Sequence, residues 1–458
     1  MWSNKANADS VGMLPGRKTF GPLFLMVATT TFVVLFWFTQ EHFNGSLMEM
    51  LNYILENGIV NTLKHGVYGG VGSYAGMVPT QEHWKILGYF SAFELVLMRL
   101  PLGREFTGPV SPEGNVPKYV DNAFASYIIT LVTFVAGVEM GWWKGSILIT
   151  NWGPMLLAMN IFALFFCIFL TVKGLYFPSS SDSGTTGNIV GDFYWGTELY
   201  PRILGWDVKV FTNCRFGLML WALLPISVAY AQKEDFNGQI SNEIIVNCFL
   251  QLVYLSKFYW WESGYMSTVD IMHDRAGYYI CWGCLVWVPT IYTITSQYIY
   301  FKFKNESSLD TPNALSTGMA ALYTIVGVIS IFVNYDADNH RAVFRENAGE
   351  VNIFGNKAEY IVAKYKPQNG KQKTSLLLLS GYWGISRHFH YLPEIMCSIC
   401  WCACAGFDHF LPHFYYVFLT ILLVDRSVRD EGRCTNKYGK YYLEYKKQVP
   451  YKIIPGVF

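Results

Sequence analysis

Charged side chains are scarce in this sequence. Only 15% of the 458 residues are Asp, Glu, Lys or Arg, whereas a soluble domain typically carries about 25%. The formal net charge is +1 at pH 7, so the chain lacks the basic excess with which proteins bind nucleic acid. We therefore expect no nucleic acid among its partners. The low charge and the 52% hydrophobic content favour a protein embedded in a membrane.

The motifs of soluble cofactor sites and metal sites are also missing. The ten cysteines lie mostly in apolar segments, which excludes a secreted disulfide framework. Cys400, Cys402 and Cys404 stand at alternating positions, which do not share a helix face, so we predict no zinc site. The stretch GGVGSYAG at 69–76 does not match GxGxxG and follows no predicted strand. We therefore predict no soluble dinucleotide-binding domain.

What the sequence has instead is a series of long apolar runs. A helix that spans a bilayer needs about 20 mostly apolar residues. Clear runs lie at 20–38, 123–142, 153–176, 215–231, 243–261, 277–300 and 314–334, and weaker ones at 47–63, 84–100, 391–406 and 411–424. We predict an all-α polytopic membrane protein with about nine or ten transmembrane helices, built as a single integral-membrane domain over residues 1–458.

The polar parts of the chain indicate its orientation. The N-terminal tail, residues 1–19, is too polar for the apolar core of a signal peptide, so we expect the run from Phe20 to act as a signal anchor. Charged stretches at 335–373 and 425–452 are assigned to the cytoplasmic side by the positive-inside rule. The C-terminal portion, residues 335–458, is therefore predicted to face the cytosol and to carry most of the polar chemistry.

Two polar clusters in this portion could bind a phosphorylated ligand. Arg341 and Arg345 are four residues apart and share one face of a helix, which is the arrangement of a phosphate clamp. The alternative is a solvated face that contacts anionic lipid. The second cluster, SGYWGISRHFHYLPE at 380–394, has rings that could stack on a base, and the alternative is an aromatic belt that anchors the chain at the membrane surface. Its two histidines are two residues apart, a poor helical spacing for a metal site.

Two further clusters could supply acid–base chemistry. Arg426 and Asp430 are four residues apart and can pair at a helix mouth, where the alternative is an ordinary polar helix end. The stretch WESGYMSTVDIMHD at 261–274 places carboxyl groups and Tyr265 between two apolar runs. Ionisable groups at membrane depth indicate an acid or a proton relay, and the alternative is a polar loop.

Five longer stretches carry a resemblance to a known family. They are TGPVSPEGNVPKY (107–119), GTELYPRILGWDVKVFTNCRFG (196–217), STVDIMHDRAGYYICWGCLVWVPTIYT (267–293), LLLLSGYWGISRHFHY (376–391) and LLVDRSVRDEGRCTNKYGKYYLEY (422–445). In these stretches the chain resembles the sterol reductase family of the endoplasmic reticulum membrane. The resemblance is closest to the members that reduce the C7–C8 double bond of Δ5,7 sterols.

The resemblance implies a multi-pass protein of the endoplasmic reticulum membrane that reduces this bond by protonating the alkene and transferring a hydride from NADPH. It implies a sterol substrate that enters from the bilayer, and membrane lipids and other enzymes of sterol biosynthesis as partners. Tyr265 is implied as the catalytic acid and Asp430 as its support or as a cofactor ligand. The implied NADPH-binding residues are Arg341, Arg345, Leu378, Trp383, His390, Tyr391, Asp430, Cys434, Thr435, Asn436, Lys437, Tyr438 and Tyr445. No metal is implied.

The chain departs from the family pattern at three positions. Tyr200 and His390 stand where the family has asparagine, and Cys284 stands where it has aspartate. Three alternatives therefore remain beside reduction at C7–C8. They are a sterol C14 or other sterol double-bond reductase, an inactive membrane protein that binds sterol and NADPH, and a membrane methyltransferase for isoprenylated cysteines.

Overall fold

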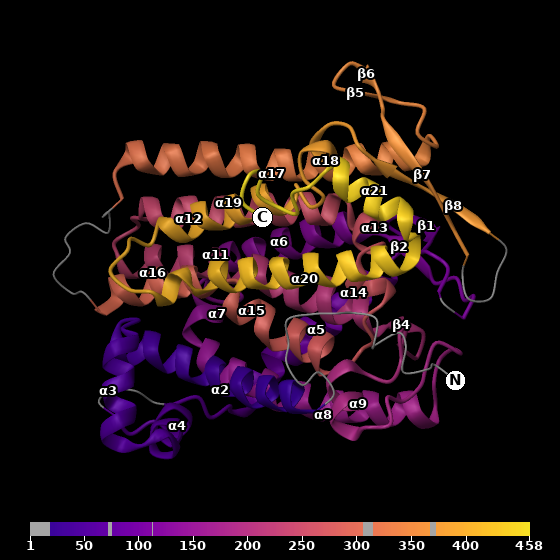
Figure 1. Ribbon diagram of the computed structural model, residues 1–458. Coiled ribbons are helices and arrows are strands. Elements are labelled where there is room, and N and C mark those ends of the chain that lie inside the picture. The colour runs from indigo at the N-terminus through magenta and orange to yellow at the C-terminus, as the bar shows by residue number, and fades with distance from the viewer. Residues whose placement is uncertain (1–18, 72–75, 112, 306–314, 367–371) are drawn as a thin grey trace. The chain divides into compact units, whose positions relative to one another are not determined.

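The computed structural model describes residues 19–71, 76–111, 113–305, 315–366 and 372–458, and this part of the chain is mostly helical (Figure 1). The described residues form two compact units. The first comprises 19–320 and 402–415, and the second comprises 321–401 and 416–458. Of the predicted polar tail at 1–19, all but Thr19 lies outside the described residues.

Long apolar helices confirm the membrane character that the sequence predicts. Within the described residues, four helical segments are long and apolar enough to cross a bilayer. They are α2 (Phe20–Phe43), α8 (Trp152–Tyr176), the continuous stretch Val208–Asp235 and α17 (Thr317–Glu346). Two shorter apolar helices are α6 (Ala123–Glu139) and α19 (Tyr391–Ala403). The count of nine or ten spans stays a prediction.

The remaining helices cover the other apolar runs and several short segments outside them. In the first unit they are α3 (Leu47–Asn57), α4 (Ile59–Tyr68), α5 (Gln81–Arg99), α7 (Ile147–Thr150), α9 (Ile189–Trp195), α12 (Asn242–Trp260), α13 (Glu262–Tyr265), α14 (Val269–Met272), α15 (Val288–Ile291), α16 (Ile294–Asn305) and η3 (Leu411–His413). In the second they are α18 (Tyr382–Ile385), α21 (Lys440–Gln448) and most of α20 (Phe414–Tyr438). The run at 47–63 is divided at Gly58, whose φ of 75° ends α3 in a conformation that favours glycine.

Two π-helical segments lie within two of the family stretches quoted above. In the first unit, α10 (Val208–Val210) leads into η1 (Phe211–Gly217) and α11 (Leu218–Asp235), and η2 (Tyr278–Trp287) precedes α15. η1 packs against η2, and a Cβ added at Gly217 would lie 2.2 Å from the carbonyl oxygen of Cys284. Only glycine therefore allows this approach. π-Helical turns are rare and occur often at functional sites.

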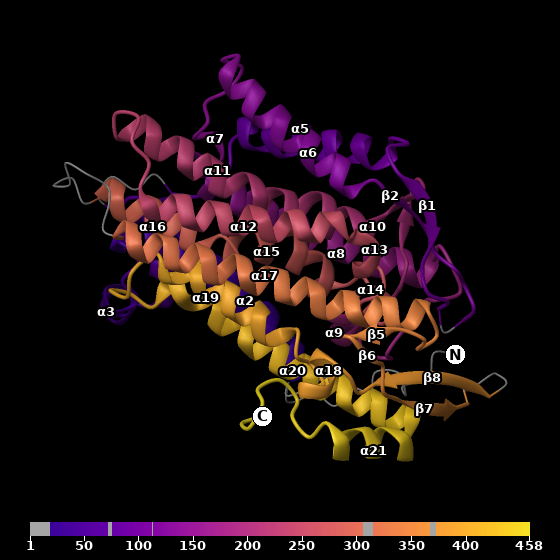
Figure 2. The ribbon, with the colours of Figure 1, turned by 90° about the horizontal axis from the view of Figure 1, so that it is seen from above.

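Short β-hairpins complete the described structure, and the prediction of an all-α chain did not include them. The antiparallel pairs are β1 (Arg104–Thr107) with β2 (Lys118–Asp121), β3 (Arg202–Ile203) with β4 (Trp206–Asp207), β5 (Asn352–Ile353) with β6 (Asn356–Lys357), and β7 (Tyr360–Tyr365) with β8 (Lys373–Leu378). In the second unit, β7 packs against α21 (Figure 2). Each hairpin lies between helices, and its strands are only two to six residues long.

We predict that Gly217→Ala lowers the stability of the first unit. The new methyl group would clash with a backbone carbonyl, and overpacking of this kind costs about 1–3 kcal/mol. Gly283→Ala is the matched control in η2, because a Cβ there meets no atom within 4 Å. Thermal unfolding of the detergent-solubilised variants should show a lower midpoint for Gly217→Ala only. Equal midpoints for Gly217→Ala and the unchanged protein would contradict the close packing of η1 on η2.

Candidate functional site

Trp383 is buried in an apolar cluster of the second unit. The cluster also contains Phe344, Ile353, Ala358 and Leu378. Trp383 Nε1 donates a hydrogen bond to the carbonyl oxygen of Ala337 on α17 at 2.7 Å. The Trp383 carbonyl accepts one from the Tyr445 hydroxyl on α21 at 3.3 Å. Trp383 is thus joined to α17 through its indole and to α21 through its backbone carbonyl. The predicted residues Leu378 and Tyr445 lie beside it.

Two arginines of α17 lie one helical turn apart at this cluster. The guanidinium carbon of Arg341 is 4.2 Å from the ring centroid of Trp383, and an Arg341 nitrogen is 3.3 Å from an Asp338 carboxylate oxygen. The Arg345 side chain is exposed and lies within electrostatic range of Asp430 on α20. α17 therefore presents Arg341 beside the Trp383 ring and Arg345 one turn further along, near Asp430.

His390 and Tyr391 extend this aromatic face. The ring centroids of Trp383 and His390 are 5.0 Å apart, and those of His390 and Tyr391 are 4.3 Å apart. His388 stacks on Tyr391, with 5.2 Å between ring centroids and 8° between ring planes. The carbonyl oxygen of His390 accepts a hydrogen bond from Asn334 Nδ2 at 2.8 Å, which ties the cluster to α17. His390, a departure from the family pattern, is thus an integral part of this face.

His388 and Asp430 bring the loop before α19 against α20. His388 Nε2 is 3.8 Å from Asp430 Oδ2. Burial lowers the pKa of His388 to about 4, although the nearby Asp430 carboxylate opposes this. Cys434 Sγ lies 3.8 Å from the same carboxylate oxygen, and burial raises the pKa of this thiol to about 12. At neutral pH both neighbours of Asp430 are therefore uncharged.

The end of α20 continues the predicted set toward the β7–β8 hairpin. Thr435 Oγ1 donates a hydrogen bond to a backbone carbonyl one turn earlier in the helix at 2.7 Å, and Asn436 is exposed. Lys437 Nζ lies 4.6 Å from the ring centroid of Tyr365. The Tyr438 hydroxyl donates to a serine hydroxyl of β8 at 3.3 Å. These four consecutive residues form the last turn of α20, and Lys437 and Tyr438 bring it to the hairpin.

Arg387, which we did not assign to the site, anchors the C-terminal segment. One of its nitrogens donates hydrogen bonds to the carbonyl oxygens of Val449 and Pro450 at 2.6 and 2.8 Å. Another lies 3.7 Å from Glu431 Oε2, which is also 3.0 Å from Lys452 Nζ. Buried charges of this kind are held by several partners because an unpaired charge is costly. Arg387 thus holds the chain that follows α21 against the predicted cofactor residues.

A buried ion pair organises the corresponding polar site of the first unit. Arg215 of η1 contacts both carboxylate oxygens of Glu262, at 2.5 and 3.1 Å, and both side chains are only 1% exposed. Arg215 also donates to Asn122 Oδ1 at 2.9 Å. Glu262 begins α13 and Tyr265 ends it. The Tyr265 hydroxyl accepts a hydrogen bond from Asn213 Nδ2, again on η1.

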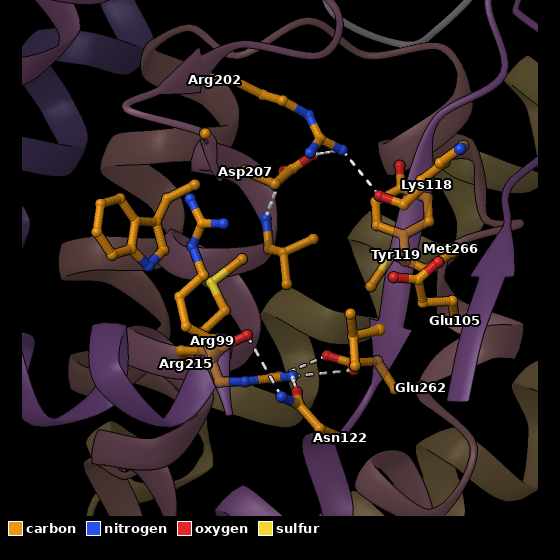
Figure 3. Close-up of a pocket in the computed structure, with 15 residues that line it drawn as sticks. Arg99, Glu105, Lys118, Tyr119, Asn122, Arg202, Asp207, Arg215, Glu262 and Met266 are labelled. Atoms are coloured by element: carbon orange, nitrogen blue, oxygen red, sulfur yellow. Dashed lines mark hydrogen bonds and ion pairs between the residues drawn. The ribbon is translucent and has the colours of Figure 1, made fainter. Parts of the chain in front are cut away.

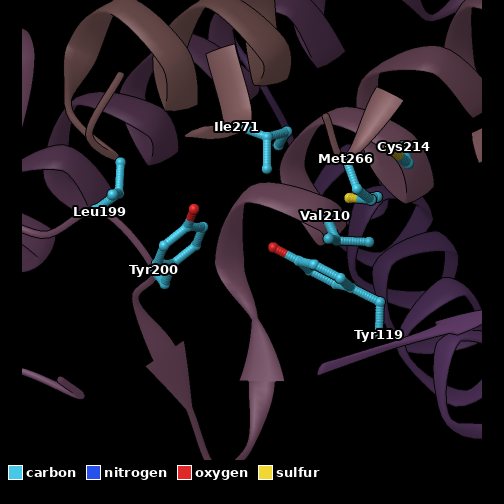
Figure 4. Packing of buried hydrophobic residues seen from close by; sticks show 7 residues of the cluster. All are labelled: Tyr119, Leu199, Tyr200, Val210, Cys214, Met266 and Ile271. Carbon is cyan, nitrogen blue, oxygen red and sulfur yellow. The ribbon is translucent and has the colours of Figure 1, made fainter. Parts of the chain in front are cut away.

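Tyr265 packs against an apolar cluster that also contains one of the departures from the family pattern. The buried members are Tyr119, Leu199, Tyr200, Val210, Cys214, Met266 and Ile271 (Figure 4). Figure 4 shows the hydroxyls of Tyr119 and Tyr200 pointing into the same gap. Tyr200 therefore takes part in packing next to Tyr265. Cys284, another departure, is buried in η2, where its carbonyl faces Gly217.

A cleft of about 210 Å³ adjoins this cluster (Figure 3). Tyr119 and Met266 belong to the cluster and also line the cleft. Its charged lining includes Arg99, Lys118, Arg202, Asp207, Arg215 and Glu262. Asp207 Oδ1 accepts a hydrogen bond from the Val210 amide at 3.0 Å, and its other oxygen lies 3.8 Å from Arg202. Such a lining suits water or a polar group rather than the rings of a sterol.

The predicted site residues thus fall into two groups. All predicted cofactor-binding residues lie in the second unit, whereas Tyr265 lies in the first. Arg215 carries a signal in the sequence, because an ionisable group in a predicted span is a candidate functional residue. Asn213 carries no such signal, because its partner is 52 residues away.

We predict that stability rises with pH between about 4 and 6.5 because of His388. In this interval the unfolded chain binds a proton at the imidazole and the folded chain does not, so deprotonation favours folding. Thermal unfolding midpoints measured across this interval should increase with pH, and His388→Gln should reduce the slope. His409→Gln, which changes a histidine of the first unit, is the control and should leave the slope unchanged. An unchanged slope in His388→Gln would contradict the burial of a neutral imidazole.

Comparisons with known proteins agree with the resemblance in the sequence. Residues 16–458 match the Ergosterol biosynthesis ERG4/ERG24 family. The chain is 44% identical over 437 residues to a 7-dehydrocholesterol reductase of Arabidopsis thaliana, which covers 95% of this chain and 96% of the relative. It is 37% identical to a 7-dehydrocholesterol reductase of Xenopus laevis over 354 residues, covering 77% of this chain and 73% of the relative.

A more distant relative carries another specificity in its name. A Delta(14)-sterol reductase of Dictyostelium discoideum is 31% identical over 437 residues, covering 95% of this chain and 90% of the relative. The family match spans almost the whole chain, and the long apolar helices agree with it. The chain therefore belongs to the ERG4/ERG24 family of sterol reductases, oxidoreductases of sterol biosynthesis.

Proposed function

We propose that this protein reduces the C7–C8 double bond of Δ5,7 sterols with NADPH in the endoplasmic reticulum membrane. The observation that carries the proposal is the 44% identity, over 95% of the chain, to a protein named 7-dehydrocholesterol reductase. Reduction at C14 is the second candidate, because relatives named Delta(14)-sterol reductase are 31% identical over similar lengths. The higher identity favours reduction at C7–C8.

The donor set of the second unit fits a phosphorylated dinucleotide. Arg341 and Arg345 supply two guanidiniums one turn apart, and guanidinium groups bind phosphate through paired, charge-assisted hydrogen bonds. Trp383 and Tyr391 form a packed aromatic wall beside these cations, with the Trp383 ring 4.2 Å from the Arg341 guanidinium carbon. NADPH, when bound, supplies the hydride for the reduction. Asp430 contacts His388 and Cys434. Its carboxylate could accept a hydrogen bond from a polar edge of the cofactor.

The chain itself must supply the proton. A sterol diene that carries no electron-withdrawing group accepts hydride poorly because the resulting carbanion is weakly stabilised, so the double bond is protonated first. The Tyr265 hydroxyl donates this proton to one carbon of the double bond, which leaves a tyrosinate and a carbocation at the other carbon. A phenol, with an ordinary pKa near 10, is protonated at neutral pH. Bound NADPH would supply the hydride at the carbocation, and Tyr265 would regain its proton from solvent.

The surroundings of Tyr265 suit this role. Phe258 packs on its ring with 5.2 Å between centroids, and the cluster of Figure 4 covers another side. An apolar enclosure limits the access of water, which would otherwise capture the carbocation. Tyr265 is itself only partly buried, so its ring edge is accessible to a ligand.

We expect Tyr265→Phe to abolish sterol reduction while NADPH binding stays nearly unchanged. Both proteins are to be produced in cells that lack their own sterol reductase activity, and the sterols are analysed by mass spectrometry. The unchanged protein should convert Δ5,7 sterols to Δ5 sterols, and the variant should leave the Δ5,7 sterols in place. Accumulation of C14-reduced sterols instead would favour the second candidate, and full activity of Tyr265→Phe would exclude this tyrosine as the acid.

We expect Arg345→Ala to raise the KM for NADPH by about tenfold to a hundredfold, since a hydrogen bond to a charged group contributes about 1.5–3 kcal/mol. The KM for NADH should change much less, because only NADPH carries the additional phosphate. Lys357→Ala removes an exposed cation of the same unit and is the control. An equal rise for both cofactors would assign Arg345 to the pyrophosphate rather than to the additional phosphate.

A further inference from the structure

A hydrogen bond from another segment of the chain orients the Tyr265 hydroxyl. Asn213 Nδ2 donates a hydrogen bond to the Tyr265 oxygen. Asn213 lies in the π-helical segment η1, between Thr212 and Cys214, which are both buried. Asn213 and Tyr265 are each only partly buried. The contact therefore lies at the edge of the apolar cluster, where a ligand can approach the hydroxyl.

From this geometry we infer that Asn213 is a positioning residue that acts through Tyr265. The inference rests on the proposed role of Tyr265 as the proton donor. A phenol can accept a hydrogen bond from an amide and still donate its own O–H proton, so that proton can be directed at the substrate. The same bond persists after proton transfer, and a hydrogen bond donated to a charged oxygen stabilises the charged form. Asn213 thus directs the proton before the step and stabilises the tyrosinate after it.

The surrounding structure fixes Asn213 in this position. Two residues further along η1, the Arg215–Glu262 ion pair joins η1 to α13, which carries Tyr265. The carbonyl oxygen of Cys214 accepts a hydrogen bond from the Tyr259 hydroxyl on α12 at 2.7 Å. Cys214 and Arg215, the two residues that follow Asn213 in η1, thus have their own partners, and neither depends on the Asn213 side chain.

The π-helical winding of η1 also contributes to the position of Asn213. A π-helical turn shifts the residues that follow it to a different face from the one they would take in an α-helix. In η1 the winding lets Arg215 reach Glu262 while Asn213 reaches Tyr265, at the two ends of the same short helix α13.

The test compares substitutions that remove the amide donor without changing the size of the side chain much. Asn213→Leu has no donor, and Asn213→Asp keeps the shape but can only accept a hydrogen bond at neutral pH. Both should lower kcat by about tenfold or more, since a well-placed proton donor contributes about 10²–10⁴-fold. The KM values for sterol and NADPH should stay within about twofold of the unchanged protein, because Asn213 acts on the proton transfer. Asn213→Gln, which retains an amide donor, should recover part of the lost kcat.

Thr212→Val is the matched control, because it removes a hydroxyl from the adjacent buried position of η1 without changing the side-chain shape. It should retain the kcat of the unchanged protein, and NADPH binding should confirm that each variant is folded. An inactive Tyr265→Phe together with full kcat in Asn213→Leu and Asn213→Asp would overturn the inference and leave the proposed acid in place. An active Tyr265→Phe would overturn the proposed acid itself. A kcat loss in Thr212→Val equal to that in Asn213→Leu would show a structural effect on η1 and would also overturn the inference.

Discussion

The buried pair of Arg215 and Glu262 is the constraint on which the first unit depends. Two opposite charges that are each 1% exposed are stable only if they remain together, because removing either partner leaves an uncompensated charge and costs about 3–5 kcal/mol. The requirement is stricter in a protein surrounded by lipid, where no water can reach an unpaired group. Segments of the chain that are far apart in sequence are therefore held in one arrangement.

This arrangement extends from the ion pair through Asn122. Its Oδ1 accepts from Arg215, and its Nδ2 donates to the carbonyl oxygens of Leu97 and Leu100 at the end of α5, at 3.1 and 2.9 Å. One network thus joins the end of α5, the start of α6, η1 and α13. The hydrogen bond between Asn213 and Tyr265 is a consequence of that network. The second unit uses the same principle, because Arg387 and Glu431 join α20 to the chain after α21.

Much of this could be predicted from the sequence, and the limits have physical causes. The apolar runs at 20–38 and 153–176 became α2 and α8 because their composition admits no other structure in a bilayer. The four-residue spacing of Arg341 and Arg345 predicted that both lie on one face of a helix. The hairpins were missed because strands of two to six residues are too short for a sustained periodic signal. η1 and η2 were missed because a π-helix differs from an α-helix in its hydrogen bonds and not in its composition. Asn213 could not be found because its role depends on a contact that only the folded chain creates.

The most direct test of the account is to follow the two hydrogens that reduction adds. Membranes containing the protein are incubated with 7-dehydrocholesterol, once with NADPH deuterated at the nicotinamide C4 in ordinary water and once with unlabelled NADPH in deuterium oxide. The product is analysed by mass spectrometry and NMR. We expect one deuterium in each experiment, at C7 in one and at C8 in the other. One hydrogen comes from the cofactor, and the other comes from Tyr265, whose hydroxyl proton exchanges with solvent. No transfer from the labelled cofactor, or solvent deuterium at both carbons, would contradict it.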